Sequence, residues 1–315
     1  MGKTVLITGG AGFIGSHLTK KLLDKNYRVI SIDNLSSYYN PKIKIRNIST
    51  FKNHENYLFS KTSILDIVRL KKLINNTKIN IVVHLAAQPG TRLSFIKPLI
   101  YEKNNVAGTY QILGLCKDIK PEKFIFASSS SVYGNSPTPF NEEKTTVKPL
   151  SLYGATKLAG EHACFTYHKN FNISMAILRF FSVYGPGGRP DMAPYIFSKA
   201  AYSDKTVDIF GDGSSSRDWT YINDITKGIY KVIKKRLSFE IINLGSNKPI
   251  TLNRMISSIE KNSGKKLKIQ TVNFRKDEPL STYADINKAK RLLNWKPKTN
   301  FDQGIKLFIN SFLNN

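Results

Sequence analysis

The sequence predicts an α/β protein in which a doubly wound parallel sheet is followed by a smaller mixed α/β region at the C-terminal end. Three observations predict this fold class. Short β-branched runs alternate with helical patterns up to about residue 180, a glycine-rich turn joins the first run to the first helical pattern, and the alternation ends after Tyr184. Alternation of this kind is typical of parallel strands connected by crossover helices.

The first part of the chain supplies the strands of the sheet. The strand candidates are Thr4–Thr8, Arg28–Ile32, Tyr57–Ser60, Asn80–Leu85, Lys123–Ala127 and Ile173–Leu178. Helical patterns lie between them, at residues 13–25, 64–75, 98–118 and 153–169. Connections of this length are crossovers rather than hairpins, so we expect the strands to run parallel with helices on both faces of the sheet.

The second part of the chain begins where glycines and prolines interrupt the pattern, at 185–190. Its elements are expected to be strands at Val207–Phe210, Glu240–Leu244 and Leu267–Gln270 and helices at 251–262 and 301–313. We therefore expect a first domain over residues 1–180. A second region over 181–315 follows, and some of its segments return to the first domain.

The composition excludes a disordered chain. Of the 315 residues, 41% are hydrophobic and 22% are charged, which is typical of a chain that buries a core. Cys116 and Cys164 are far apart in the sequence, which predicts neither a disulfide framework nor a zinc site, so no metal is expected. No apolar run approaches the roughly 20 residues that a membrane span needs. We expect a cytoplasmic protein without membrane insertion.

The net charge of +26 raises the possibility of a nucleic-acid partner. The lysines, however, are scattered as pairs such as Lys20-Lys21 and Lys234-Lys235, without a block of about five or six like charges. This distribution favours a solvated lysine-rich surface and no nucleic-acid partner. Attraction of acidic small molecules or of membrane surfaces is the alternative.

The turn after the first strand carries glycines at the spacing GxxGxxG, at Gly9, Gly12 and Gly15, and leads into an amphipathic helix. Such glycines let the backbone turn tightly and approach a pyrophosphate, which the helix N-terminus then faces. Asp33 ends the second strand, about 20 residues further on, where a carboxylate accepts hydrogen bonds from the adenosine ribose and repels a 2′-phosphate. The motif predicts a Rossmann-type domain that binds NAD.

Tyr153 and Lys157 are four residues apart, so they share one face of the helix predicted there. A lysine ammonium beside a phenol favours the phenolate, which makes the tyrosine a usable base near neutral pH. The run Ala127–Gly134 supplies serines about 25 residues upstream, at the end of a predicted strand. A serine there can hydrogen-bond the hydroxyl or ketone of a substrate.

With these motifs the chain resembles an extended short-chain dehydrogenase/reductase over nearly its whole length. The resemblance implies that Ser129 is the catalytic serine, with Ser130 as a neighbouring candidate, and that Lys157 also holds the nicotinamide ribose. The residues that it implies for the cofactor are Gly9, Gly12, Phe13, Ile14, Gly15, Asp33, Asn34, Asp66, Ile67, Leu85, Ala86, Ala87, Gln88, Asn105, Ser128, Tyr153, Lys157 and Phe180.

The resemblance also bears on the reaction. Family members that dehydrate or decarboxylate sugar nucleotides usually carry acids just after the catalytic serine or threonine, and here those positions are Ser130 and Ser131. Oxidation at C4 of the sugar, rotation of the keto sugar and return of the hydride to its other face is then the simplest chemistry. We expect a 4-epimerase whose NAD stays tightly bound and is regenerated in each turnover.

Three segments, 84–92, 179–193 and 217–224, are similar to those of bacterial UDP-glucuronate 4-epimerases. The resemblance implies that the substrate is a UDP-sugar, best UDP-glucuronate, bound mainly by the C-terminal region. The diphosphate and the carboxylate of such a substrate would both attract arginines. The residues implied for the sugar nucleotide are Arg92, Ser129, Ser182, Arg189, Met192, Arg217 and Arg275. UDP-glucose/galactose and the UDP-N-acetylhexosamines remain alternatives. So do a dehydratase or decarboxylase and a non-catalytic relative that binds NAD or nucleic acid.

The family also implies a homodimer, built through a four-helix bundle. The helices predicted at 98–118 and 153–169 carry the apolar residues Tyr110, Leu113, Cys116, Cys164 and Tyr167. Burial of these residues in the chain's own core is the alternative explanation.

Overall fold

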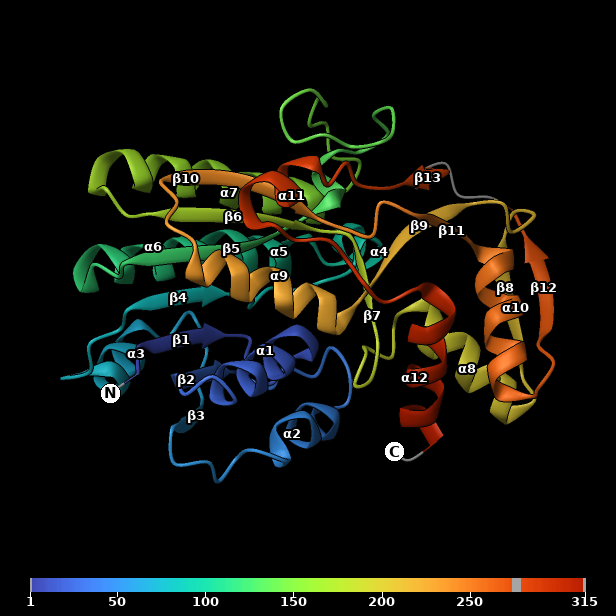
Figure 1. The fold of residues 1–315 in the computed structure, drawn as a ribbon, viewed down its shortest axis with the longest axis horizontal. Helices are drawn as coiled ribbons and strands as arrows, with labels where there is room; N and C mark the ends of the chain where they lie inside the picture. Colours follow the sequence, from blue (N-terminus) through green and yellow to red (C-terminus); the bar gives the residue numbers. More distant parts are fainter. Residues whose placement is uncertain (1, 274–278, 314–315) are drawn as a thin grey trace. The chain divides into compact units, whose positions relative to one another are not determined.

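The computed structural model describes residues 2–273 and 279–313, and it confirms the predicted α/β fold class. The chain divides into two compact units (Figure 1). The first unit comprises residues 1–134, 147–179 and 229–242, and the second comprises 135–146, 180–228 and 243–315.

A seven-stranded sheet forms the centre of the first unit. Its strands are β1 (Thr4–Thr8), β2 (Arg28–Asp33), β3 (Tyr57–Lys61), β4 (Ile81–His84), β5 (Lys123–Ser129), β6 (Met175–Phe180) and β10 (Phe239–Leu244), in the order β10-β6-β5-β4-β1-β2-β3. β1 pairs in parallel with β2 on one side and with β4 on the other, so the chain reverses its direction of travel across the sheet at β1. Ligands of doubly wound sheets bind outside the carboxyl ends of the strands at such a switch point.

Helices cover both faces of this sheet. They are α1 (Phe13–Leu23), α2 (Pro41–Ser49), α3 (Ile67–Ile74), α4 (Thr91–Ile96), α5 (Pro98–Tyr101), α6 (Gly108–Ile119), α7 (Leu152–Phe171) and the second half of α9 (Ile222–Lys234). In Figure 1, α1 and α9 cross in front of the strands, and α6 and α7 lie behind them. Leu6, Val82, Phe124 and Ile177 are fully buried between these layers, as expected of strands covered on both faces.

The single helix predicted over 98–118 is interrupted in the structure. A π-helical turn, Glu102–Ala107, lies between α5 and α6. Such a turn inserts one extra residue, and it is commonly found at functional sites. It carries the buried Asn105, whose side chain is fully engaged in hydrogen bonds described below.

The strand predicted at Glu240–Leu244 is one of the segments that return to the first domain, where it forms the seventh strand of the large sheet, β10. Ile242 and Leu244 are fully buried there, which explains why the strand is added to the sheet edge beside β6. The ammonium of Lys123, at the start of β5, donates to the carbonyls of Val232 (2.7 Å) and Ile233 (3.1 Å). This bond anchors the end of α9 to the sheet just before β10 begins.

The second unit contains the remaining elements. They are β7 (Ser182–Tyr184), α8 (Ala193–Ser203), β8 (Thr206–Phe210), β9 (Ser216–Tyr221), β11 (Pro249–Thr251), α10 (Leu252–Ser263), β12 (Lys268–Val272), β13 (Ser281–Thr282), α11 (Asn287–Leu293) and α12 (Phe301–Leu313). β9 pairs with β7, β11 and β13, and β8 pairs in parallel with β12. Tyr184, Phe197, Trp219 and Phe308 pack in the core of this unit. None of the described helices is both long and apolar enough to span a membrane.

Three of the five residues proposed for a dimer interface are instead buried inside the chain. Leu113, Cys116 and Cys164 are fully buried in the core of the first unit, so for them the core alternative is correct. Tyr110 is 49% exposed, and Tyr167 is partly buried against that core.

Candidate active site

The glycine-rich turn joins β1 to α1 as the motif predicts. Gly9 has φ +71°, a conformation that side-chain-bearing residues rarely adopt, and a Cβ at Gly15 would lie 2.2 Å from the Gly9 carbonyl oxygen. Gly12 stands at the N-cap of α1, where no side chain bonds the N–H groups of the first turn, which begins with Phe13 and Ile14. This cradle fits a pyrophosphate, because the positive end of the helix dipole and unbonded N–H groups both favour an anion.

Asp33 ends β2 and is buried. Its Oδ1 accepts a hydrogen bond from the Leu35 N–H at 2.8 Å and lies 3.5 Å from the ammonium of Lys44 on α2. The next residue, Asn34, bonds the Ser36 N–H through its side chain. Sequence reasoning missed Lys44, because no helix was predicted over 41–49 and a lysine among so many carries no signal of its own.

Asn105 holds the segment that follows β4, Leu85–Gln88, by hydrogen bonds to its backbone. The Asn105 side chain accepts from the Gln88 N–H (2.7 Å), donates to the Gln88 carbonyl (3.1 Å) and donates to the Thr156 hydroxyl (3.0 Å). Leu85, Ala86 and Ala87 are half-buried in this segment. Asn105 therefore links the predicted cofactor segment to helix α7.

Asp66 lies apart from these bonds. Its exposed side chain caps α3, which begins at Ile67, by accepting a hydrogen bond from the Arg69 N–H at 3.1 Å. Capping of the helix is therefore sufficient to explain an acidic residue at this position, without a role in cofactor binding.

His84, at the end of β4, is fixed in one neutral tautomer. Thr109 donates its hydroxyl proton to the Asn105 carbonyl (2.6 Å), so its oxygen accepts from Nε2 of His84 (3.1 Å). The Thr8 oxygen accepts from the Ala86 N–H, and the Thr8 hydroxyl therefore donates to Nδ1 at 2.7 Å. Burial lowers the pKa of His84 to about 3. A second ring proton would break the bond to Thr8.

We expect the free energy of unfolding to fall as the pH drops below about 6.5, the ordinary pKa of histidine. The His84 pKa is lowered in the folded state, so the unfolded chain binds the extra proton first, and stability is lost by about 1.4 kcal/mol per pH unit until pH 3 is approached. Denaturant unfolding at pH 7, 6 and 5 measures this loss. His84→Gln should flatten the dependence, whereas replacing the exposed His162 should not, and equal slopes in both variants would contradict the assignment.

Helix α7 places the candidate base. Ser151 caps it by accepting from the Gly154 N–H (3.1 Å), so the helix starts at Leu152 and Tyr153 and Lys157 lie on one face, one turn apart. The Lys157 ammonium lies 6.0 Å from the centre of the Tyr153 ring and donates to the Ala127 carbonyl at 2.8 Å. Because Lys157 is buried, its pKa is lowered to about 8.

The predicted serines lie at the carboxyl end of β5. Ser128 is buried and donates to Glu161 of α7. Ser129, half-buried, accepts from the Ser131 N–H (3.1 Å) and so starts the short 3₁₀ turn Ser130–Val132. The Ser129 hydroxyl donates to Ser131 at 3.1 Å, a bond that a substrate oxygen can replace without breaking the backbone turn.

The remaining predicted substrate residues come from several elements. Arg92 is exposed on α4 in the first unit. Phe180, which was predicted for the cofactor, is buried at the end of β6. Ser182 begins β7, and Arg217 lies on β9, where its Nη1 donates to the carbonyls of Ser216 (2.9 Å) and Leu280 (3.3 Å). Arg275 lies outside the described residues.

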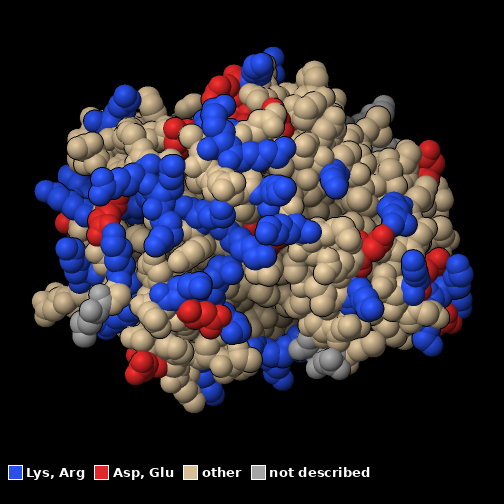
Figure 2. Space-filling view, in the orientation of Figure 1, with Lys and Arg blue, Asp and Glu red and all other residues tan. Residues whose placement is uncertain are grey.

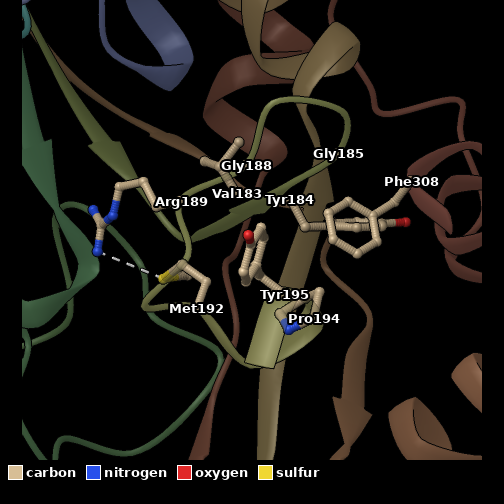
Figure 3. A pocket seen from close by; sticks show the side chains of 9 residues that line it. All are labelled: Val183, Tyr184, Gly185, Gly188, Arg189, Met192, Pro194, Tyr195 and Phe308. Carbon is tan, nitrogen blue, oxygen red and sulfur yellow. Dashed lines mark hydrogen bonds between the residues drawn. The ribbon is translucent and has the colours of Figure 1, made fainter. Parts of the chain in front are cut away.

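Arg189 and Met192 border a small pocket of the second unit (Figure 3). Arg189 forms two hydrogen bonds with Asp191, at 3.0 and 2.7 Å, and its Nη2 lies 3.6 Å from the Met192 sulfur. The pocket is lined by Val183, Tyr184, Gly185, Gly188, Arg189, Met192, Pro194, Tyr195 and Phe308. Its walls contain none of the residues predicted to be catalytic.

Asp218 and Glu161 are among the buried carboxylates that sequence reasoning did not single out. Asp218 is fully buried and accepts from the N–H groups of Ser246 (2.5 Å), Asn247 (2.9 Å) and Ala284 (3.1 Å). It thereby ties β9, which carries Arg217, to two other segments of the second unit. The second carboxylate, Glu161, is one turn beyond Lys157 and could have been found from its spacing of four.

The comparisons with known proteins identify the family of this chain. The sequence profile of the family described as GDP-mannose 4,6 dehydratase matches residues 6–308. An uncharacterized protein of Methanocaldococcus jannaschii, MJ1055, is 43% identical, covering 99% of this chain and 97% of its own length. UDP-glucuronate 4-epimerase of Thermodesulfobacterium geofontis is 41% identical over 97% of this chain and 94% of its own length.

The similarity extends to solved structures. UDP-glucuronic acid 4-epimerase from Bacillus cereus, solved in complex with UDP-glucuronic acid and NAD, superposes with a TM-score of 0.92 at 39% identity, covering 99% of both chains. The resemblance to extended short-chain dehydrogenases/reductases is therefore confirmed. The chain belongs to the GDP-mannose 4,6 dehydratase family, and over its whole length it is similar to UDP-glucuronate 4-epimerases.

Proposed function

We propose that the protein is an NAD-dependent 4-epimerase that interconverts UDP-glucuronate and UDP-galacturonate. The observation that carries this proposal is the placement of Tyr153 and Lys157 on one face of α7, beside the serines that end β5. The first unit then binds NAD and performs the proton transfer, and the second unit mainly binds the UDP-sugar. The full-length similarity to UDP-glucuronate 4-epimerases supports the choice of reaction.

The residues of the first unit fit NAD. The pyrophosphate would lie at the N-terminus of α1, and the adenosine ribose at Asp33, whose carboxylate accepts hydrogen bonds from ribose hydroxyls and disfavours the 2′-phosphate of NADP. The segment Leu85–Gln88, supported by Asn105, would lie along the dinucleotide. When bound, NAD accepts a hydride from C4 of the sugar and returns it to the opposite face.

The proton transfer belongs to Tyr153. Its phenolate takes the proton of the sugar 4-hydroxyl as the C4 carbonyl forms, and it returns that proton once the turned sugar is reduced again. Lys157 stabilises the phenolate with its positive charge, and Ser129 donates a hydrogen bond to the same sugar oxygen. Proton and hydride both return, so each turnover leaves the enzyme and its cofactor unchanged.

The residues after Ser129 favour epimerisation over dehydration. Elimination of water needs a second acid–base pair, and Ser130 and Ser131 occupy the positions at which family members with that activity usually carry acids. In the second unit, Arg217 and Arg275 are the proposed partners of the diphosphate. Ser182, together with Arg189 or Arg92, is proposed for the uronate carboxylate, and Met192 for contact with the substrate.

Incubation of the purified enzyme with UDP-glucuronate, without added NAD, tests the proposal. We expect NMR to show UDP-galacturonate, because retained NAD is regenerated in each turnover. Turnover of UDP-glucose or UDP-N-acetylglucosamine alone would overturn the sugar assignment. A stable 4-keto product with loss of water or carbon dioxide would identify a dehydratase or decarboxylase instead.

We further propose a homodimer formed by α5, α6 and α7 of two copies. These helices expose Leu99 (77%), Tyr110 (49%) and Phe165 (46%), which a four-helix bundle would cover. Light scattering at micromolar concentration should give twice the chain mass, and Phe165→Lys should give the single mass. A single mass for the unmodified protein would refute the dimer.

We place this enzyme in the cytoplasm, without a nucleic-acid partner. Cys116 and Cys164 are both free thiols in the structure, which suits a reducing compartment. Lys and Arg far outnumber Asp and Glu on the face shown in Figure 2. A surface of this kind attracts acidic small molecules such as a UDP-sugar, an effect that salt weakens.

A further inference from the structure

A buried ion pair lies one helical turn beyond Lys157. Glu161 and Arg179 are each only 3% exposed, and they are joined by two hydrogen bonds, from Arg179 Nε to Oε1 (2.9 Å) and from Nη2 to Oε2 (2.6 Å). Glu161 comes from α7 and Arg179 from β6. None of the reactions described above uses either residue.

The pair is connected to the end of β5 at two points. Glu161 Oε1 also accepts the hydroxyl of Ser128, the residue before Ser129. The Arg179 guanidinium lies 4.7 Å from the centre of the ring of Tyr133, which follows the 3₁₀ turn after Ser129. The strand end that carries the candidate catalytic serine is therefore bonded on one side of Ser129 and packed on the other.

The contacts form a ladder along one face of α7. Lys157 donates to the Ala127 carbonyl, and one turn later Glu161 accepts from the Ser128 hydroxyl. Successive turns of the helix thus bond successive residues of β5, which fixes how far the helix can slide or rotate against the strand. Tyr153 occupies the next position of the same face, one turn before Lys157.

We propose that Glu161 and Arg179 are positioning residues for the reaction, which hold α7 and the end of β5 together and set the electrostatic environment of Tyr153 and Lys157. The proposal rests on the proposed function, because it assigns their role in that chemistry. Neither residue is proposed to contact substrate or cofactor.

The charge balance around Lys157 supports this role. Among the described residues, the titratable side chains that interact with Lys157 are Tyr153, Glu161 and Cys164 of α7 and His84 of β4. Arg179 of β6 is bonded to one of them, Glu161. Burial raises the pKa of the Cys164 thiol and lowers that of His84 to about 3, so both are neutral at pH 7. Glu161 and Arg179 are then the two fixed charges of this set, and Glu161 raises the pKa of Lys157 against the effect of burial.

A purely structural pair predicts a different pattern of variant behaviour. Buried ion pairs often contribute little to stability, and their replacement by apolar residues can be neutral. Removing one partner leaves the other charge uncompensated next to Lys157. If the pair sets the electrostatic environment of Tyr153 and Lys157, the two removals shift their pKa values in opposite directions. If the pair only stabilises the fold, the charge-neutral double variant keeps its kcat.

The test compares Glu161→Gln and Arg179→Met in the pH dependence of kcat, with Glu161→Asp as the conservative control. We expect the whole profile of Glu161→Gln to move to lower pH by about one unit, because the loss of a negative charge lowers the pKa values of both Lys157 and Tyr153. The profile of Arg179→Met should move the other way, and that of Glu161→Asp should stay in place. Unshifted profiles, or shifts of the same sign, would overturn the proposal.

Two further measurements keep the outcome decisive. The double variant Glu161→Gln/Arg179→Met leaves no uncompensated buried charge. If either single variant does not fold, the double variant still tests whether the bonds between α7 and the end of β5 position the catalytic residues. We expect its kcat to fall at least about tenfold with KM nearly unchanged, and an unchanged kcat would overturn the proposal. The second measurement is a pH titration of tyrosinate absorbance, from which the signal of the matching Tyr153→Phe protein is subtracted. It reports the pKa of Tyr153 in each variant without substrate, so it tests this proposal even if the protein is not an epimerase.

Discussion

Replacement of Tyr153 by Phe is expected to lower kcat by about a thousandfold while the protein stays folded. The change removes one hydroxyl from a half-buried ring, so its cost to stability is small. It also removes the group that takes and returns the proton of the sugar 4-hydroxyl, and a positioned general base contributes roughly 10²–10⁴-fold. Lys157 keeps its bond to the Ala127 carbonyl, so the surroundings of the ring remain in place.

The measurement is the rate of UDP-galacturonate formation by NMR, with the NAD content of the purified variant determined in parallel. Tyr202→Phe is a matched control, because Tyr202 stacks against Phe312 in the second unit and has no assigned role. We expect its rate to be within about twofold of the unmodified protein, because the change removes one hydroxyl from a partly buried ring outside the proposed site. A rate reduced less than tenfold in Tyr153→Phe would contradict the assignment of Tyr153 as the general base.

Among the variants predicted here, Asp218→Ala is expected to lower the free energy of unfolding the most. The buried carboxylate bonds the N–H groups of Ser246, Asn247 and Ala284 and the hydroxyl of Thr220. Removing it leaves all four donors without their acceptor, and two of them, the Ala284 N–H and the Thr220 hydroxyl, are buried, so we expect a cost of about 3–5 kcal/mol. At roughly 2–4 °C per kcal/mol, the Tm should fall by about 10 °C.

Asp212→Ala is the control for Asp218→Ala. Asp212 is exposed, and its side chain accepts hydrogen bonds from the backbone and the side chain of Ser214, two residues away. Its removal should lower the Tm by less than about 2 °C. Differential scanning calorimetry compares the two variants, and equal Tm values for them would contradict the bridging role of Asp218. Because Asp218 adjoins Arg217, we also expect a higher KM for the UDP-sugar in the folded Asp218→Ala enzyme.

The sheet was predictable because most of its strands are buried on both faces and their sequences are therefore short, continuous β-branched runs. β1, for example, is buried at all five positions. The sheet that β10 joins was not predictable, because β10 comes after much of the second unit in the sequence and nothing in its residues says which sheet it joins. The π-helical turn at Glu102–Ala107 was hidden for a similar reason, since helical periodicity over 98–118 continues on either side of it.

The candidate site was predictable where a motif fixes a local spacing, as for Gly9, Gly15, Tyr153 and Lys157. Local spacing does not show which buried charges meet across the fold. Glu161 and Arg179 are 18 residues apart, and their pairing depends on α7 packing against the sheet. Lys44 was missed for the same reason.

The division of the chain limits how this protein can be made. The backbone crosses between the two units five times, and the first unit takes its last segment from residues 229–242. A ribosome must therefore synthesise more than three quarters of the 315 residues before β10 can cover the edge of β6. Until then Lys123 also lacks the carbonyls of α9 that it bonds in the finished fold. Neither unit can be inherited, exchanged or expressed as a contiguous module.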